Sequence, residues 1–362
     1  MMKKLFLLVA SLPLCFQALA TMPYETYLES WNASWEANYQ GLPPEGAQSY
    51  QNVTLNISFA SYVFGSGPPY GITGLQFSTV DTDVQGIITY IHSHGGKVKL
   101  SFGGASTAGP YYFISTTPSW PNNASELATG IANLFVTYDF DGVDFDIEDS
   151  LPAGVTATEF ASQLITFLQA VRAALPAGTI ISITVPGQGW NQYWQPLVEG
   201  AAAIAGLIDV INFMEYDIYV SSSLAGGYPA MIAADISTYT SSPDTPLAPP
   251  NWLPGWNIPA SKVNIGLMPG TADNSLVLTL ADAQKVVQTA VNVGAYGVMT
   301  WDIDRDAVGQ DGQAPYAFST AIRQGLANGT AANQISLIRV AKTRSNTPPD
   351  FVAQPVPPHG AP

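Results

Sequence analysis

Cysteine, histidine and charged side chains are scarce in this sequence of 362 residues. Cys15 is the one cysteine, the three histidines are His92, His94 and His359, and charged residues make up only 11% of the chain. The histidines are too few and too scattered for a metal site or a catalytic triad. Neither a Gly-x-Ser-x-Gly motif nor a phosphate-binding glycine loop occurs. Carboxylates and tyrosines therefore remain to carry any chemistry, and no cofactor is expected.

The first twenty residues have the pattern of a secretory signal peptide. Lys3 and Lys4 precede an apolar run over 5–16, and a small-residue cleavage site ends at Ala20. The run is too short to span a membrane. Cleavage would also remove Cys15, so the secreted protein would have no disulfide and no thiol, and its stability would rest on its core.

The charge balance limits the partners of the chain. Acidic residues outnumber basic ones by 27 to 12, and loss of the two lysines in the signal peptide would leave 10 basic residues and a net charge of −17. Such a surface disfavours nucleic acid and anionic membranes. The 47% of apolar residues are ample for a core. Together with the signal peptide, we expect an extracellular monomer that neither binds nucleic acid nor inserts into a membrane.

Strand-like runs alternate with helical runs along most of the chain. Eight strand-like segments separated mostly by helical ones predict an α/β fold, a (β/α)8 TIM barrel, with the active face at the carboxyl ends of the strands. The predicted strands cover 25–31, 53–60, 97–102, 141–148, 179–185, 209–216, 263–267 and 296–301, and the predicted helices 82–94, 125–137, 156–175, 191–208, 279–293 and 316–327.

Some segments do not fit the alternation. Residues 32–52 give little helix, and 221–262 form a long connection rich in proline and serine. The chain therefore divides into a signal peptide over 1–20, a barrel over 21–329 and a Pro-rich tail over 330–362 that is expected to be flexible.

The segment 141–148 has a pattern that favours a functional strand. Its β-favouring residues alternate with acids, so Asp144, Asp146 and Glu148 should share one face, about 6.6 Å apart from one Cα to the next. An amphipathic edge strand would also alternate. However, three neighbouring carboxylates repel one another and shift each other's pKa, as acid catalysis at a glycosidic oxygen requires.

This segment closely resembles the Asp-Gly-x-Asp-x-Asp-x-Glu signature of family 18 glycoside hydrolases, the chitinases and endo-N-acetylglucosaminidases. Two further elements are similar to that family: Ser101-Phe102-Gly103-Gly104, which there supports the acid strand, and Met214-Glu215-Tyr216-Asp217 at the end of the sixth predicted strand. Alone, the first is also typical of a glycine-rich loop and the second of a buried strand. Glu215 should point to the helix layer, where it needs a partner or exposure.

The resemblance implies roles for individual residues. Glu148 would protonate the glycosidic oxygen, and the acetamido oxygen of the substrate would attack the anomeric carbon and give an oxazolinium ion. Asp146 would orient that acetamido group, Asp144 would share a proton with Asp146, and Tyr216 would hold the acetamido carbonyl. Substrate contacts would come from Asp217, Met214 and three tryptophans, Trp301, Trp190 and Trp31, which could equally be core residues. Trp252 and Trp256 would border the cleft.

The predicted function is a secreted chitinase that acts on chitin or chito-oligosaccharides. Only residues 268–295 separate the last two predicted strands, which leaves no room for the α+β domain that many processive family members carry there. An open cleft and endo-type cleavage are therefore expected. The alternatives are an endo-β-N-acetylglucosaminidase acting on N-glycan cores, a sugar-binding lectin without activity, and an interaction protein that uses the tail.

Overall fold

The structure is a computed structural model that describes most of the chain between residues 22 and 329. The described ranges are 22–32, 34–44, 49–64, 72–76, 82–105, 124–148, 154–187, 203–218, 224–242, 256–273 and 275–329. The predicted signal peptide, the tail, most of the predicted helix 191–208 and the side chains of Trp190 and Trp252 lie outside the described residues.

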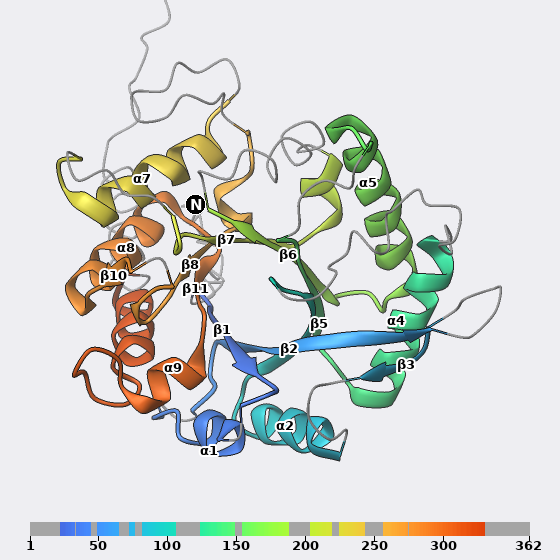
Figure 1. Ribbon diagram of the computed structural model, residues 1–362, viewed down its shortest axis with the longest axis horizontal. Helices are drawn as coiled ribbons and strands as arrows, with labels where there is room; N and C mark the ends of the chain where they lie inside the picture. Colours follow the sequence, from blue (N-terminus) through green and yellow to red (C-terminus); the bar gives the residue numbers. More distant parts are fainter. Residues whose placement is uncertain are drawn as a thin grey trace, which may run out of the picture.

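Eight parallel strands close into a barrel enclosed by helices (Figure 1), which confirms the predicted (β/α)8 TIM barrel. All eight predicted strands are present. Around the ring they are β1 (Tyr24–Glu29), β2 (Val53–Phe64), β4 (Lys97–Gly103), β5 (Gly142–Asp146), β6 (Ile180–Pro186), β7 (Val210–Met214), β8 (Val263–Leu267) and β11 (Gly297–Thr300), which pairs with β1.

Most predicted helices are also found. They are α2 (Thr82–Ser93), α4 (Ala124–Tyr138), α5 (Ala157–Ala174), α8 (Leu280–Val293) and a last helix over 317–329. At the start of α5, the Glu159 N–H donates to Thr156 Oγ1 (3.2 Å), and the Thr156 N–H donates back to the Glu159 carboxylate (2.9 Å). This capping box satisfies two N–H groups that a helix start leaves without intrahelical partners.

One of the two segments with weak helical signal contains a long helix. Helix α7 (Gly227–Thr240) lies within 221–262, which corrects the interpretation of that segment as a connection, whereas the described part of 32–52 holds the short helix α1 (Trp35–Gln40), in line with its weak signal. The sequence of α7 contains Gly227, Pro229 and four β-branched residues, which lower its helix propensity. Its Ile232, Ile236 and Tyr239 are nonetheless buried, and this packing stabilises the helix in place of propensity.

Trp256 is a core residue and does not border a cleft. It is 2% exposed, and its ring lies 5.0 Å from the ring of Tyr239 and 6.0 Å from that of Phe213, centroid to centroid. The loop before β8 therefore uses this tryptophan to attach itself to α7 and β7.

Smaller elements decorate the barrel. Strand β3 (Ile72–Gln76) pairs antiparallel with β2, and α9 (Ile303–Val308) follows β11. Between β8 and β11 lie a hairpin, β9 (Gly270–Thr271) with β10 (Val277–Leu278), and helix α8. No additional α+β domain is inserted between these strands, which confirms that expectation.

The two faces of the sheet differ in character. Outward-facing residues such as Val143, Phe145 and Ile147 belong to the apolar core between strands and helices, and the Phe145 ring packs against Phe167 of α5 at 5.0 Å. The inward face is polar: Lys99, Asp144, Ser182, Asn212 and Asn264 are all fully buried. Barrel interiors are commonly filled by branched apolar side chains, so a polar interior indicates a functional role.

Candidate active site

The predicted acid strand is β5, and it places its carboxylates as expected. Asp144 and Asp146 lie two residues apart and face the barrel interior, with 0% and 2% of their surfaces exposed. Glu148 follows the strand and is half-buried. Parallel pairing sets Ser101 beside Asp144 and Gly103 beside Asp146 on β4. The three acids therefore lead from the barrel interior to its carboxyl-end mouth.

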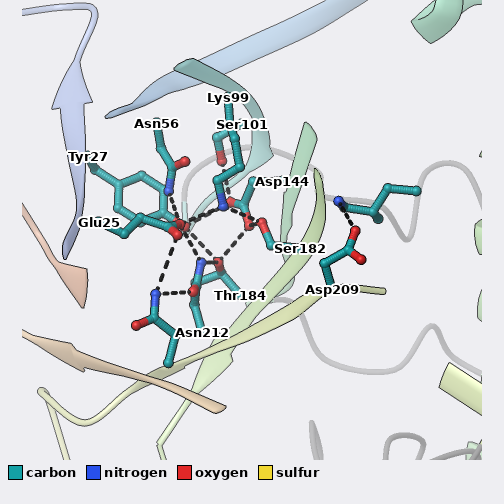
Figure 2. A network of polar contacts seen from close by, with 12 residues as sticks. Glu25, Tyr27, Asn56, Lys99, Ser101, Asp144, Ser182, Thr184, Asp209 and Asn212 are labelled. Atoms are coloured by element: carbon teal, nitrogen blue, oxygen red, sulfur yellow. Dashed lines mark hydrogen bonds and ion pairs between the residues drawn. The ribbon is translucent and has the colours of Figure 1, made fainter. Parts of the chain in front are cut away.

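Asp144 accepts hydrogen bonds from four hydroxyl groups on three strands (Figure 2). Tyr27 and Ser101 donate to Oδ2, at 2.8 and 2.7 Å, and Ser182 and Thr184 donate to Oδ1, at 2.6 and 2.9 Å. Four donors around one buried carboxyl group stabilise its ionised form. These hydrogen bonds thus fix the position of the Asp144 carboxyl group beneath Asp146.

Asp146 has very different surroundings. Its Oδ1 is buried and has no hydrogen-bond partner among the described residues. Burial raises the pKa of Asp146 well above its usual value, and the negative charges of Glu148 and Asp144 raise it further. Asp146 therefore retains a proton to a higher pH than an ordinary aspartate and can donate a hydrogen bond to a group placed above it.

Glycine at position 103 allows β4 to lie against this acid. Gly103 has a φ of +114°, and a Cβ built there would lie 1.9 Å from the carbonyl oxygen of Asp146. Any other residue would push the two strand ends apart. The Ser-x-Gly-Gly element thus has the structural role predicted for it, and its serine in addition contacts Asp144.

The end of β7 contributes Met214, Tyr216 and Asp217 to the same mouth. Met214 and Tyr216 are 6% and 7% exposed and belong to a second apolar cluster, separate from the main core. Burial raises the pKa of Tyr216 well above its usual value, and the charges of Asp146 and Glu148 raise it further. The Tyr216 hydroxyl therefore remains a hydrogen-bond donor near both acids. Asp217 follows in a left-handed conformation, with a φ of +56°.

Aromatic rings line the opposite side of the mouth. The Trp301 ring is stacked on Phe59 (5.7 Å between centroids, 14° between planes) and lies 5.3 Å from Tyr27. Trp31, which is 46% exposed, is also stacked on Phe59, with 5.9 Å between the ring centroids. Aromatic faces of this kind suit the apolar faces of sugar rings. Trp301 and Trp31 therefore lie where the sequence interpretation expected subsite residues.

Sequence reasoning missed Tyr27, Phe59, Ser182 and Thr184. A usable signal was present, because buried parallel strands normally form continuous apolar runs, whereas the run of β6 is interrupted by hydroxyl residues at two alternate positions, 182 and 184. The identity of the acid that these hydroxyls contact could not be read from one strand. It depends on the register between strands, which pairs Asp144 with Ser182.

The described residues contain neither a group of candidate metal ligands nor a candidate membrane-spanning helix. Within the described part of the chain, no group of three or more His, Cys, Asp or Glu side chains is arranged to hold a metal ion. No helix in that part is both long and apolar enough to cross a membrane.

Comparison with known proteins identifies the family of this fold and site. A family model described as Glycosyl hydrolases family 18 matches residues 26–277. The solved structure of a GH18 chitinase from Pseudoalteromonas aurantia has a TM-score of 0.58 at 23% identity and covers 84% of this chain and 99% of that one. A chitinase from Bacteroides thetaiotaomicron has a TM-score of 0.59 at 16% identity, with 85% and 97% covered. At these identities the two structures show the shared fold.

Curated relatives match over shorter stretches. Chitinase Chi52 of Paenibacillus xylanexedens is 27% identical over 190 residues, which is 48% of this chain and 34% of that protein. The killer toxin subunits alpha/beta of Kluyveromyces lactis are 23% identical over 165 residues, 42% of this chain and 14% of that protein. The alignments thus span about a third or less of the relatives' own length.

Proposed function

The chain belongs to glycosyl hydrolases family 18, and from that premise we propose that it is a secreted, retaining chitinase that cleaves β-1,4-linked N-acetylglucosamine polymers. The observation that carries this proposal is the convergence of Asp146, Glu148 and Tyr216 at one mouth of the barrel. One side of that mouth carries acidic side chains, and the other side is formed by the aromatic rings around Trp301. A sugar with an acetamido group can bind the acids through that group and the aromatic rings through its apolar face.

The reaction proceeds with the assistance of the substrate. Glu148 donates a proton to the glycosidic oxygen as the bond to the anomeric carbon breaks. The acetamido oxygen of the same sugar attacks that carbon from the opposite face and forms an oxazolinium ion. Family 18 is an exception to the scheme with two enzyme carboxylates, so no protein nucleophile is needed.

Asp146 and Tyr216 act on the acetamido group. The unprotonated oxygen of Asp146 accepts from the acetamido N–H, which orients that group and stabilises the positive charge of the oxazolinium ion, while the Tyr216 hydroxyl donates to the acetamido oxygen. Glu148, now ionised, accepts a proton from a water molecule as that water attacks the anomeric carbon and opens the oxazolinium ring. Two displacements at the same carbon retain its configuration.

Asp217 and the aromatic side chains position the polymer. Asp217 contacts a sugar hydroxyl, and Met214 and Trp301 form the floor under the sugar that is cleaved. Trp31 lines a neighbouring subsite. The absence of an inserted domain between β8 and β11 favours an open binding surface and endo-type cleavage.

The test is a comparison of products from three substrates: chitin, chito-oligosaccharides and a denatured glycoprotein. The protein should release oligomers from the first two, and Glu148→Gln should lower kcat by about 10³-fold with the fold intact, since general acids contribute roughly 10²–10⁴. Release of glycans from the glycoprotein alone would instead assign an endo-β-N-acetylglucosaminidase. Binding without turnover would assign a lectin, and near-normal turnover by Glu148→Gln would contradict the role of Glu148.

Secretion is part of the proposal and has its own test. Expression of the full chain should yield a protein in the medium whose N-terminus begins after Ala20, as measured by intact mass and N-terminal sequencing. Retention of residues 1–20 on the released protein would contradict the signal peptide.

A further inference from the structure

A buried ion pair lies inside the barrel, beneath the proposed catalytic acids. Lys99 of β4 and Glu25 of β1 are 0% and 1% exposed, and Lys99 Nζ lies 2.6 Å from Glu25 Oε1 (Figure 2). Neither residue reaches the mouth of the barrel, and neither has a part in the reaction described above. The pair is therefore a charged feature of the interior that the proposed chemistry leaves unexplained.

A purely structural role is a poor explanation for this pair. Removing two charges from water costs several kcal/mol for each ion, and well-packed apolar residues are often as stable or more stable. The interior also makes room for the lysine: a Cβ built on Gly142 of β5 would lie 2.8 Å from Lys99 Cγ. The glycine of the acid strand thus leaves space for the lysine stem.

Lys99 is linked to Asp144 through one hydroxyl group. Lys99 Nζ lies 2.6 Å from Ser182 Oγ, and Ser182 Oγ lies 2.6 Å from Asp144 Oδ1. A protonated lysine can only donate hydrogen bonds, so Ser182 must accept from Lys99. Its single proton is therefore directed to Asp144.

Glu25 is linked to Asp144 by a second route. Asn212 Nδ2 donates to Glu25 Oε1 and to Thr184 Oγ1, both at 2.9 Å, and Thr184 donates to Asp144 Oδ1 at 2.9 Å. The amide of Asn212 is itself oriented, because Asn264 Nδ2 donates to its Oδ1 at 2.9 Å. Both hydroxyls that contact Oδ1 thus accept from a donor in the layer of the ion pair.

We propose that Glu25 and Lys99 form a positioning pair for the reaction, which directs the hydroxyl protons of Ser182 and Thr184 to Asp144, keeps Asp144 anionic and leaves the shared proton on Asp146. The inference rests on the proposed function for its catalytic consequence. The pair acts through other residues and touches no substrate.

The charged and titratable groups around Asp144 are consistent with this role. Tyr27 and Glu25 face it from β1, Lys99 faces it from β4, and Asp146 follows it on β5, whereas β6 contributes only hydroxyl groups. Lys99 is the one cation among these groups. Without Lys99, Asp144 would compete with Asp146 for the proton that the two acids share.

The test compares Glu25→Gln/Lys99→Met, which replaces the ion pair by neutral side chains of similar size, with Ser182→Ala and the triple variant. We expect the double variant to fold and to lose about tenfold in kcat with little change in KM. The acidic limb of its pH–rate profile should move to higher pH by about one unit, which corresponds to a tenfold change in a protonation equilibrium. If Lys99 acts through Ser182, the triple variant should be slower than Ser182→Ala by no more than the factor that Glu25→Gln alone costs.

A second measurement does not depend on turnover. Carboxyl ¹³C NMR should show Asp146 titrating at lower pH in Glu25→Gln/Lys99→Met and in Ser182→Ala than in the wild type, because a protonated Asp144 no longer raises the pKa of Asp146. Ser182→Ala keeps the ion pair, so it also serves if the double variant does not fold. Asp209→Asn is the matched control. Asp209 forms an ion pair with Arg172, and in Figure 2 no dashed line joins it to the residues around Asp144, so this substitution should alter neither kcat nor the Asp146 titration.

The outcomes separate the two hypotheses. Equal kcat and pH profile in the wild type and the double variant, or additive losses in the triple variant, would overturn the positioning role while leaving the chitinase proposal intact. A wild-type protein inactive on all three substrates would overturn the proposed function. The Asp146 titration would still decide the role of the pair, and an unchanged titration in both variants would overturn it.

Discussion

At the scale of single residues, the site depends on the contrast between two neighbouring carboxyl groups. Asp144 accepts four hydrogen bonds, whereas Asp146 has a buried oxygen with no partner among the described residues. Hydrogen bonds favour the charged form and burial favours the neutral form. The same side chain two residues apart is therefore suited to opposite charge states, which is how paired acids acquire different roles.

Tyr216→Phe tests the proposed donor to the acetamido group. Because burial and the nearby acids keep the Tyr216 hydroxyl protonated, its loss should lower kcat by about 10²-fold, the usual cost of removing one such donor, without a new limb in the pH profile below about pH 9. Steady-state kinetics on chito-oligosaccharides measure this. Tyr138→Phe, on helix α4, is the control and should behave as the wild type; equal rates for Tyr216→Phe would contradict the assignment.

At the scale of elements, the motif that begins at Met214 at the end of β7 has side chains on both faces of the sheet. Met214 and Tyr216 face the mouth, whereas Glu215 is fully buried on the helix side, as strand alternation predicts. Tyr239 of α7 donates to the Glu215 carboxylate, and Tyr228 donates to its carbonyl oxygen. Helix α7 thereby supplies the partner that Glu215 requires, and it fixes the strand end that carries Tyr216.

A second buried acid on α7 makes this contact sensitive to pH. Burial and the charge of Glu215 raise the pKa of Asp235 to about 10, and burial raises the pKa of Glu215 to about 7. The folded chain thus binds protons that the unfolded chain has already released. Stability from this pair is present at low pH and is lost as pH rises toward these values.

Asp235→Asn should remove much of that pH dependence. The amide introduced at position 235 can donate to Glu215 without needing a proton, so the variant should keep on the order of 1–3 kcal/mol of unfolding free energy that the wild type loses between about pH 5 and 9. Urea denaturation across this range measures it. Asp139→Asn, at an exposed side chain, is the control. A parallel loss in Asp235→Asn and the wild type would show that the pair does not titrate in this range.

At the scale of the whole molecule, the last helix joins the two ends of the barrel. Tyr24 of β1 lies 2.9 Å from the Ser319 hydroxyl, and Arg323 donates to the carbonyl oxygens of Pro43 and Ser49, both at 2.8 Å. Asp306 of α9 accepts from the backbone of the same helix. The helix over 317–329 is therefore joined to β1, to α9 and to the segment before β2 by contacts within the described residues.

Truncation after Ala331 tests whether the tail contributes. Because the helix over 317–329 would remain, the truncated protein should keep the unfolding temperature and the kcat of the full chain on soluble chito-oligosaccharides. Thermal unfolding and kinetics measure this, and a truncation after residue 316, which removes that helix, should fail to fold. Loss of activity or secretion on removal of 332–362 would support the interaction role of the tail.

The sequence by itself determined the barrel and its acid strand, because those signals are local. Alternation over 141–148 depends only on strand geometry, and the strand-like segments were marked by β-favouring residues within short stretches of the chain. The capping box at Thr156 is likewise complete within four residues. Helix α7 was missed, since its stability comes from burial and not from its own composition.

Only the tertiary structure decided which side chains surround the acids. Tyr27, Ser182 and Thr184 lie 117, 38 and 40 residues from Asp144 along the chain, and no local pattern specifies that they meet. The closure of the barrel and the register of its strands bring them together, because a shift of one residue would turn every inward side chain outward. The same register sets Lys99 beside Glu25, so the charge inside the barrel is a property of the fold.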